Sequence, residues 1–173
     1  KGVTLKRLSF ILTMLVAMLV AVPVFAAPSP VRTSIVDFDI TNLNRESMKE
    51  TDINIGADFY LKISWKVTSE NVNPGDWLEF QLPEKLKFKD VDSAEMDIKA
   101  PDGQSIGKAV ITPGNPSKIR ITFNDWVKDH TDIRGTVWLA ANFNKGDDSI
   151  IPKVTITLVD MGSGEKKEIT VKT

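Results

Sequence analysis

The chain of 173 residues contains no cysteine, one histidine and one tyrosine. Without cysteine no disulfide can form, so we expect the packing of a core to supply the stability of the fold. With a single histidine and no cysteine, a zinc site would need carboxylates for nearly all its ligands, which excludes the usual zinc sites. We therefore expect no metal and no cofactor.

An excess of charge of one sign is also missing, because 22 lysines and arginines face 23 aspartates and glutamates. Nucleic-acid binding requires clustered basic side chains to neutralise phosphates, so a nucleic acid is not an expected partner. The content of 42% hydrophobic and 26% charged residues excludes a disordered or collagen-like chain. It suffices for one sizeable core.

A long hydrophobic run occurs once, near the N-terminus, at residues 8–22. Basic residues at positions 6 and 7 precede it, and Pro23 and the small residues Val24 and Ala26 follow it. This order is typical of a secretory signal peptide over 1–26, with the mature chain starting at Ala27. A permanent membrane anchor is the alternative, but the run falls short of the roughly 18 residues that a span needs. We expect a secreted protein without membrane insertion after cleavage.

Beyond the leader, apolar and polar residues alternate with a period of two, most clearly from Ala57 to Val67. Alternation of this kind predicts antiparallel strands with one buried face. The other expected strands cover Val36–Ile40, Leu78–Leu82, Ala94–Ile98, Ile119–Phe123, Val137–Phe143, Val154–Leu158 and Ile169–Val171. Their inward faces predict one core that includes Phe59, Leu61, Ile63, Trp65, Phe80, Ile121, Phe123 and Leu139.

Proline and glycine turns separate these runs, as in the segments 73–76, 100–103 and 112–116. Only residues 124–131 could form a helical turn. Many short strands at regular spacing predict an all-β, two-sheet antiparallel sandwich of the immunoglobulin-like type. We assign 27–32 to a short linker and 33–173 to the domain, and we expect a second domain to follow it.

Catalytic chemistry has weak support in the sequence. His130 lies in a polar stretch without a nucleophile motif, which is typical of a solvated loop. The adjacent Asp147 and Asp148 could bind calcium, but the alternating oxygens and closing glutamate of a calcium loop are missing. Acidic pairs such as Asp90 with Asp92, or Glu84 with Glu95, are more simply surface residues than glycosidase carboxylates. We expect no enzyme.

Two tryptophans have different expected roles. Trp65 is in phase with the apolar residues of its strand, which predicts a core position. Trp138 is out of phase with its apolar neighbours Val137 and Leu139, so we expect it on the outer face. An outward tryptophan can fill a ligand or interface pocket, which makes Trp138 a candidate binding residue.

Several segments together resemble the immunoglobulin-like adhesin domains of Gram-positive surface proteins. They are the stretches 34–42, 64–67 and 72–83, the last with a Gly-Asp-aromatic start and a Leu-Pro end. The stretch Ile119–Val127, reading IRITFNDWV, resembles the Thr-Phe-Thr-Asp-Tyr-Val-type motif of collagen- and fibrinogen-binding adhesins. Trp126 stands where that family commonly has tyrosine.

The resemblance implies the first of two tandem domains that enclose a ligand, with a C-terminal latch of the second domain added as a strand to the first. Strand addition satisfies the free N–H and C=O groups of an exposed sheet edge. The implied acceptor is the motif strand with the residues that follow it: Lys118, Ile119, Arg120, Ile121, Thr122, Phe123, Asn124, Asp125 and Trp126. Some related domains carry a Lys-Asn isopeptide crosslink, for which Lys62 or Lys66 with Asn142 are candidates beside the simpler alternative of solvated lysines.

These expectations define a non-enzymatic adhesion domain, secreted or attached to the bacterial cell wall. Its expected partners are a host matrix or surface protein of the collagen or fibrinogen class and a second adhesin domain of the same full-length protein. The alternative is a noncatalytic carbohydrate-binding or pilin-type structural module.

Overall fold

Strands make up most of the part of the chain that the computed structural model describes, residues 26–89, 95–144, 146 and 152–173. The predicted signal peptide lies almost entirely outside these residues, as do Asp90, Asp92, Asp147 and Asp148. The strands are β1 (Thr33–Thr41), β2 (Phe59–Val67), β3 (Trp77–Gln81), β4 (Leu86–Phe88), β5 (Met96–Lys99), β6 (Ser105–Thr112), β7 (Lys118–Phe123), β8 (Arg134–Phe143), β9 (Lys153–Asp160) and β10 (Lys166–Lys172). A 3₁₀ helix, η1 (Asp125–Asp129), follows β7.

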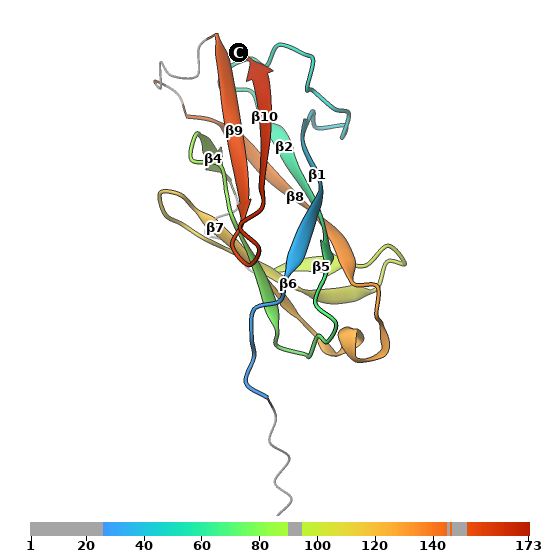
Figure 1. Ribbon diagram of the computed structural model, residues 1–173. Coiled ribbons are helices and arrows are strands. Elements are labelled where there is room, and N and C mark those ends of the chain that lie inside the picture. The colour runs from blue at the N-terminus through green and yellow to red at the C-terminus, as the bar shows by residue number, and fades with distance from the viewer. Residues whose placement is uncertain (1–25, 90–94, 145, 147–151) are drawn as a thin grey trace, which may run out of the picture.

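Two antiparallel sheets face each other, which confirms the predicted immunoglobulin-like sandwich. Sheet B has the strand order β1-β2-β8-β4, and sheet A has the order β10-β9-β3-β7-β6-β5. Figure 1 shows β1 and β10, which are edge strands of different sheets, side by side along the molecule. The first described residues and the C-terminal end of β10 lie at opposite ends of the molecule (Figure 1).

One hydrophobic core fills the space between the sheets. The eight predicted core residues, Phe59, Leu61, Ile63, Trp65, Phe80, Ile121, Phe123 and Leu139, are all buried. Fully burying one such aliphatic or phenyl side chain contributes roughly 1.5–3 kcal/mol. The rings of Trp65, in sheet B, and Phe123, in sheet A, pack on each other with centroids 5.8 Å apart. This contact joins the two sheets through the core.

Two strands were missing from the sequence prediction. β4 has three residues, too few to show a period of two. β6 places Gly107 and Ala109 on its inner face beside Ile111, and such small residues give a weak hydrophobic signal. Added to β7, the strands β6 and β5 extend sheet A beyond β3.

The alternation in the expected strand Val36–Ile40 predicts Val36 on the same face as Phe38 and Ile40, and this prediction is wrong. The pairing of β1 with β2 shifts between Ile35 and Asp37, which marks a β-bulge at Val36. A bulge adds one unpaired residue to one strand, and the inward–outward alternation of side chains shifts by one residue at that point. Ile35 and Phe38 are therefore both buried, whereas Val36 is 62% exposed.

The segment expected to be a linker is in part bonded to the body of the domain. The amide of Val31 donates to the carbonyl of Trp77, and the amide of Trp77 donates to the carbonyl of Ser29. The buried carboxylate of Asp76 accepts from the amide of Ser29 at 2.8 Å. These bonds place residues 29–31 against the start of β3.

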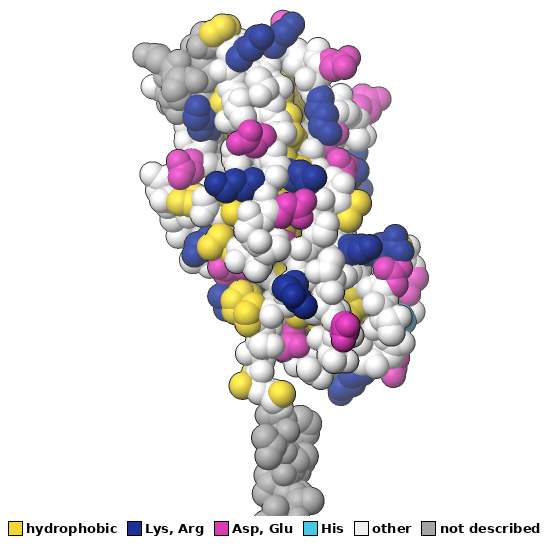
Figure 2. Space-filling view, in the orientation of Figure 1, with side chains coloured by type: hydrophobic (Ala, Val, Ile, Leu, Met, Phe, Trp, Pro, Cys, Tyr) yellow, Lys and Arg dark blue, Asp and Glu magenta, His cyan; other side chains and the backbone are white. Residues whose placement is uncertain are grey.

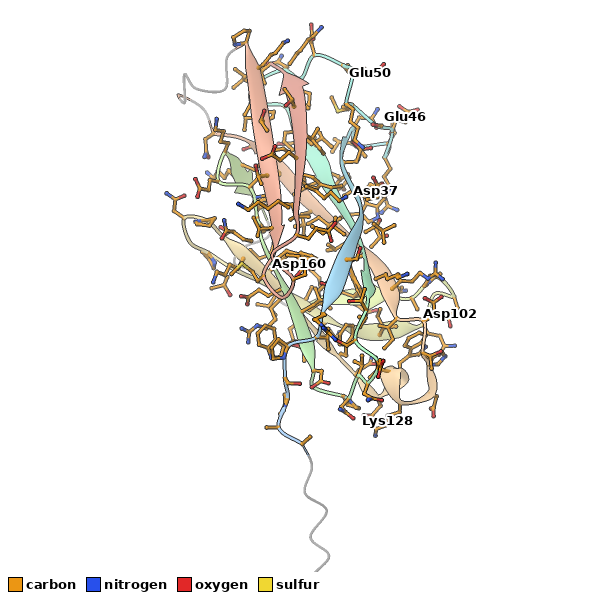
Figure 3. All side chains as sticks on the ribbon, viewed as in Figure 1. Asp37, Glu46, Glu50, Asp102, Lys128 and Asp160 are labelled. Atoms are coloured by element: carbon orange, nitrogen blue, oxygen red, sulfur yellow. The ribbon has the colours of Figure 1, made fainter. Side chains whose placement is uncertain are left out.

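A second buried carboxylate ties β1 to the turn between β9 and β10. Asp160 accepts hydrogen bonds from the amides of Gly162 at 2.8 Å and Ser163 at 3.2 Å. Its other oxygen accepts from the hydroxyl of Thr33 in β1. Figure 3 labels Asp160 at this turn, where the two sheets meet. One side chain therefore fixes both the turn and the adjacent edge strand.

Candidate functional site

The strand predicted to accept a latch, β7, is not a sheet edge. Its residues pair with β3 on one side, as in Leu78 with Ile121, and with β6 on the other, as in Ala109 with Ile121. The prediction that Lys118–Phe123 offers an open edge is therefore wrong. The reason is β6, the strand that the sequence prediction lacked.

The direction of the Thr122 amide follows from neighbouring bonds. The amide of Phe123 donates to Asp76, before β3, and the amide of Asn124 donates to Ile106 in β6. Successive residues of a strand point their backbone N–H and C=O groups to opposite sides. The N–H and C=O of Thr122 therefore point toward β6. Its N–H belongs to the ladder of this sheet, so proline at position 122 would disrupt the domain itself.

The side chains of β7 face as predicted, with Ile119, Ile121 and Phe123 buried. On the outer face, the guanidinium of Arg120 lies 3.9 Å from the ring centroid of Trp77 and 3.0 Å from the carboxylate of Glu79. Lys118 lies 3.8 Å from the same carboxylate. The charges on this face are therefore already paired.

The residues after β7 form the end of the sandwich. The side-chain oxygen of Asn124 caps η1 by accepting from the amide of Trp126 at 2.9 Å. Asp125 pairs with Lys128 at 3.2 Å. Trp126 packs against the core and stacks on His130 with ring centroids 3.5 Å apart. His130 is therefore part of a structural stack, with its Nδ1 2.7 Å from the carbonyl oxygen of Trp126.

Trp138 lies on the outer face of sheet B, where the sequence places it. The guanidinium of Arg45 lies 4.8 Å from its ring centroid, and Tyr60 meets it edge-on at 6.3 Å. Arg45 has a φ of 67°, a left-handed conformation that is rare for arginine. The loop between β1 and β2 thus holds the Arg45 guanidinium over Trp138. The alternation of residues within a strand does not reveal such a contact from a loop.

The candidate crosslink residues are not brought together. Lys62 donates to Asp37 at 2.8 Å and pairs in register with Trp138, and Lys66 pairs with Arg134. Asn142, farther along β8, donates to Asp58 at 3.4 Å. Within the described ranges, no group of three or more histidines, aspartates or glutamates is placed to hold a metal ion. None of the described helices is long and apolar enough to cross a membrane.

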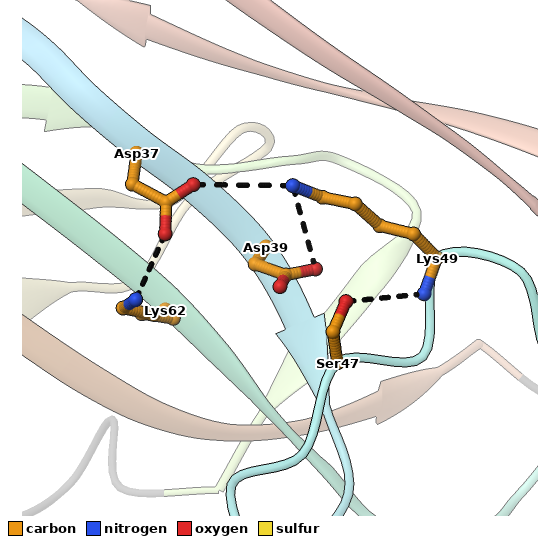
Figure 4. A network of polar contacts seen from close by, with 5 residues as sticks. All are labelled: Asp37, Asp39, Ser47, Lys49 and Lys62. Carbon is orange, nitrogen blue, oxygen red and sulfur yellow. Dashed lines mark hydrogen bonds and ion pairs between the residues drawn. The ribbon is translucent and has the colours of Figure 1, made fainter.

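A network of charges covers the exposed side of β1 (Figure 4). Lys49, in the loop after β1, lies 3.9 Å from Asp37 and 3.8 Å from Asp39. The hydrogen bond from Lys62, aided by both lysine charges, holds the pKa of Asp37 below its usual value. Over the face in Figure 2, basic and acidic side chains are likewise interspersed.

This network predicts a modest loss of stability in acid. A lowered folded-state pKa means that the pairs of Asp37 stabilise the fold above its unfolded pKa, about 3.9, and that this contribution is lost as the pH falls through the folded value. Because Asp37 is partly exposed, we expect at most about 1 kcal/mol. Urea unfolding of wild type and Asp37→Asn should differ at pH 6, and the difference should shrink as the pH falls below the unfolded pKa of Asp37. An equal difference at pH 6 and below that pKa would contradict the assignment.

A groove lies between β1 and β10. It encloses about 480 Å³ and is lined by Val36, Asp37, Phe38 and Lys49 on one wall and by residues 167–170 of β10 on the other. Edge strands are where proteins accept an added strand. The groove therefore has the open edges that β7 lacks.

The sequence pattern of a family described as bacterial Ig domain matches residues 52–148, more than half of the chain. The chain belongs to this bacterial Ig domain family. No curated protein matches the sequence.

Solved structures with a similar fold include surface adhesins of Gram-positive bacteria. A serine-rich repeat protein (Srr2) of Streptococcus agalactiae has 17% identity and a TM-score of 0.57, over 85% of this chain and 47% of its own. The collagen adhesin (CNA) of S. aureus has 21% identity and a TM-score of 0.51, over 86% of this chain and 46% of its own. The bacterial Ig domain thus spans about half the length of these adhesin chains.

Proposed function

We propose that this protein is a non-catalytic adhesion module, exported to the surface of a Gram-positive bacterium, that binds a host matrix or surface protein jointly with a second immunoglobulin-like domain. The observation that carries the proposal is the sandwich, shared with a serine-rich repeat protein and a collagen adhesin, of whose chains this chain covers 47% and 46%. The remaining half of such a chain is where a partner domain would lie. Export rests on the signal-peptide pattern of residues 1–26.

A collagen-type matrix protein is the first ligand to test, because one of the similar structures is described as a collagen adhesin. The charge pairs on the outer faces of both sheets favour a ligand recognised by shape and backbone bonding over one recognised by charge alone. The latch belongs to the same proposal, but its acceptor has to be an edge strand and not β7.

The test compares binding of this chain alone with binding of the same chain joined to the domain that follows it in the full-length protein. We expect at least about a tenfold gain in affinity for immobilised collagen or fibrinogen when both domains are present, because two linked contacts act together. Surface plasmon resonance at 150 mM salt measures it, with albumin as the control surface. Equal affinity of the single and paired domains would contradict joint binding.

A further inference from the structure

We propose that β10 accepts an extended, uncharged peptide segment of a partner protein as an added strand, in the groove between β1 and β10. The choice of a protein partner rests on the proposed function. The edge geometry stands on the structure alone. Among the described strands, β10 pairs with β9 alone in sheet A, and β1 pairs with β2 alone in sheet B.

The free backbone groups of β10 follow from two hydrogen bonds. The carbonyl of Glu165 accepts from Asp160 at the end of β9, and the carbonyl of Lys172 accepts from Ile53 on the opposite side. Because the direction of the backbone N–H and C=O groups alternates along a strand, those of Glu168 and Thr170 point away from β9, toward the groove. No described residue donates to or accepts from these groups through its backbone.

Both ends of the open stretch are closed. At the upper end, the loop residue Asp52 forms a parallel bridge with Lys172, and Met48 donates to the carbonyl of Ile40 in β1. At the lower end, the carboxylate of Glu165 accepts from the amide of Ile35 at 2.9 Å. The opening therefore spans residues 36–38 of β1 and 167–170 of β10, which sets the length of a segment that could bond there.

The chemistry of the rim selects the occupant. Asp37 is paired with Lys62 and Lys49, and Lys167 lies 3.4 Å from the carboxylate of Glu165. The carboxylate of Glu168, which also lines the groove, accepts from the hydroxyl of Thr157 in β9 at 3.1 Å. A charged segment would find no unpaired counter-charge in these groups. The exposed apolar side chain of the rim is that of Val36, turned out by the bulge. An uncharged strand with an apolar residue toward Val36 complements both features.

The hairpin supplies a matched pair of variants. Thr170 and Thr155 stand opposite each other in β10 and β9, and their hydroxyl oxygens are 2.7 Å apart. By the same alternation, the N–H of Thr170 points away from β9 into the groove. The N–H of Thr155 points away from β10, on the side of β3, which pairs with β9 at Val159 and Asp160. Thr170→Pro and Thr155→Pro each remove one outward N–H and the same hydroxyl contact. Proline is tolerated at edge positions whose N–H is not bonded within the sheet.

The experiment is an NMR titration of the ¹⁵N-labelled protein with a blocked, uncharged peptide of alternating threonine and valine that ends in two asparagines for solubility. We expect shift changes confined to residues around Val36 and Glu168–Thr170, and at least about fivefold slower exchange of the Glu168 and Thr170 amides at saturation. Thr155→Pro should retain these changes, and Thr170→Pro should lose them while keeping a folded spectrum.

Three results would overturn the proposal. They are no shift changes at the groove, changes that persist in Thr170→Pro, and protection of the same amides at high protein concentration without peptide, which would assign the groove to a second copy of the chain. If Thr170→Pro does not fold, Val36→Lys serves instead, because it places a charge at the groove without touching the ladder, and unchanged binding by it would count against the proposal. Since no host protein is used, failure here is distinguishable from failure of the adhesion proposal.

Discussion

Replacement of Asp160 by alanine is expected to lower the free energy of unfolding by about 4 kcal/mol. The carboxylate is 1% exposed and accepts three hydrogen bonds, from the amides of Gly162 and Ser163 and the hydroxyl of Thr33. Alanine leaves these donors without their acceptor. Each unsatisfied buried group costs about 1–3 kcal/mol, and bonds to a charged partner are the stronger ones. Urea unfolding at pH 7 measures the change.

Asp160→Asn is the matched control. A carboxamide oxygen can still accept from both turn amides, and the Thr33 hydroxyl can rotate to accept from the new amide group. We therefore expect Asp160→Asn to lose about 1 kcal/mol, well below the alanine variant. Similar losses for both variants would mean that the negative charge, rather than the set of hydrogen bonds, is what the fold requires.

Gly135→Ala is expected to cost about 3 kcal/mol, at the upper end of the range for overpacked cores. Gly135 pairs directly with Trp65 across β2 and β8. A Cβ atom at position 135 would stand 2.7 Å from Cζ2 of that indole and 3.3 Å from Cε2. The ring is 1% exposed and packed on Phe123, so moving it would disturb the contacts of the core.

A double-mutant cycle with Trp65→Phe identifies the cause. Phenylalanine lacks the outer part of the indole, so Gly135→Ala in that background should cost less than about 1 kcal/mol, although Trp65→Phe itself loses stability through the cavity it leaves. Free energies of unfolding of the four proteins in urea give the coupling. Additive losses would show that the glycine is needed for its backbone and not for the space it gives the ring.

The fold class and most of the core were predictable because alternation records which face of a strand is buried. Trp65 and Phe80 are examples, since each is in phase with its apolar neighbours and each is buried. Val36 was mispredicted for a local reason: a bulge changes the phase by one residue without changing composition. The alternation of apolar and polar residues indicates which side chains are buried, but it does not indicate where the pairing between two strands shifts.

The candidate site was harder to predict, because its character depends on which strands are neighbours. The side chains of β7 point to the predicted faces, but β6 pairs with β7 on the side away from β3. This pairing makes β7 an inner strand. Whether a strand is an edge depends on contacts far apart in sequence. The groove beside β10 joins residues 36–38 to residues 167–170, and only the three-dimensional arrangement brings these together.

The bonds that hold residues 29–31 against Trp77 have a mechanical consequence. The chain enters at one end of the molecule, and β10 finishes at the other (Figure 1). A pull between the two ends therefore acts along β1 and loads its hydrogen bonds with β2 in shear, all at once, rather than opening them one after another. The bonds of Ser29 and Val31 to Trp77 come first in this path and would take up strain before β1 does. A domain attached at both ends and exposed to flow would thus resist extension through the same contacts that order its N-terminal segment.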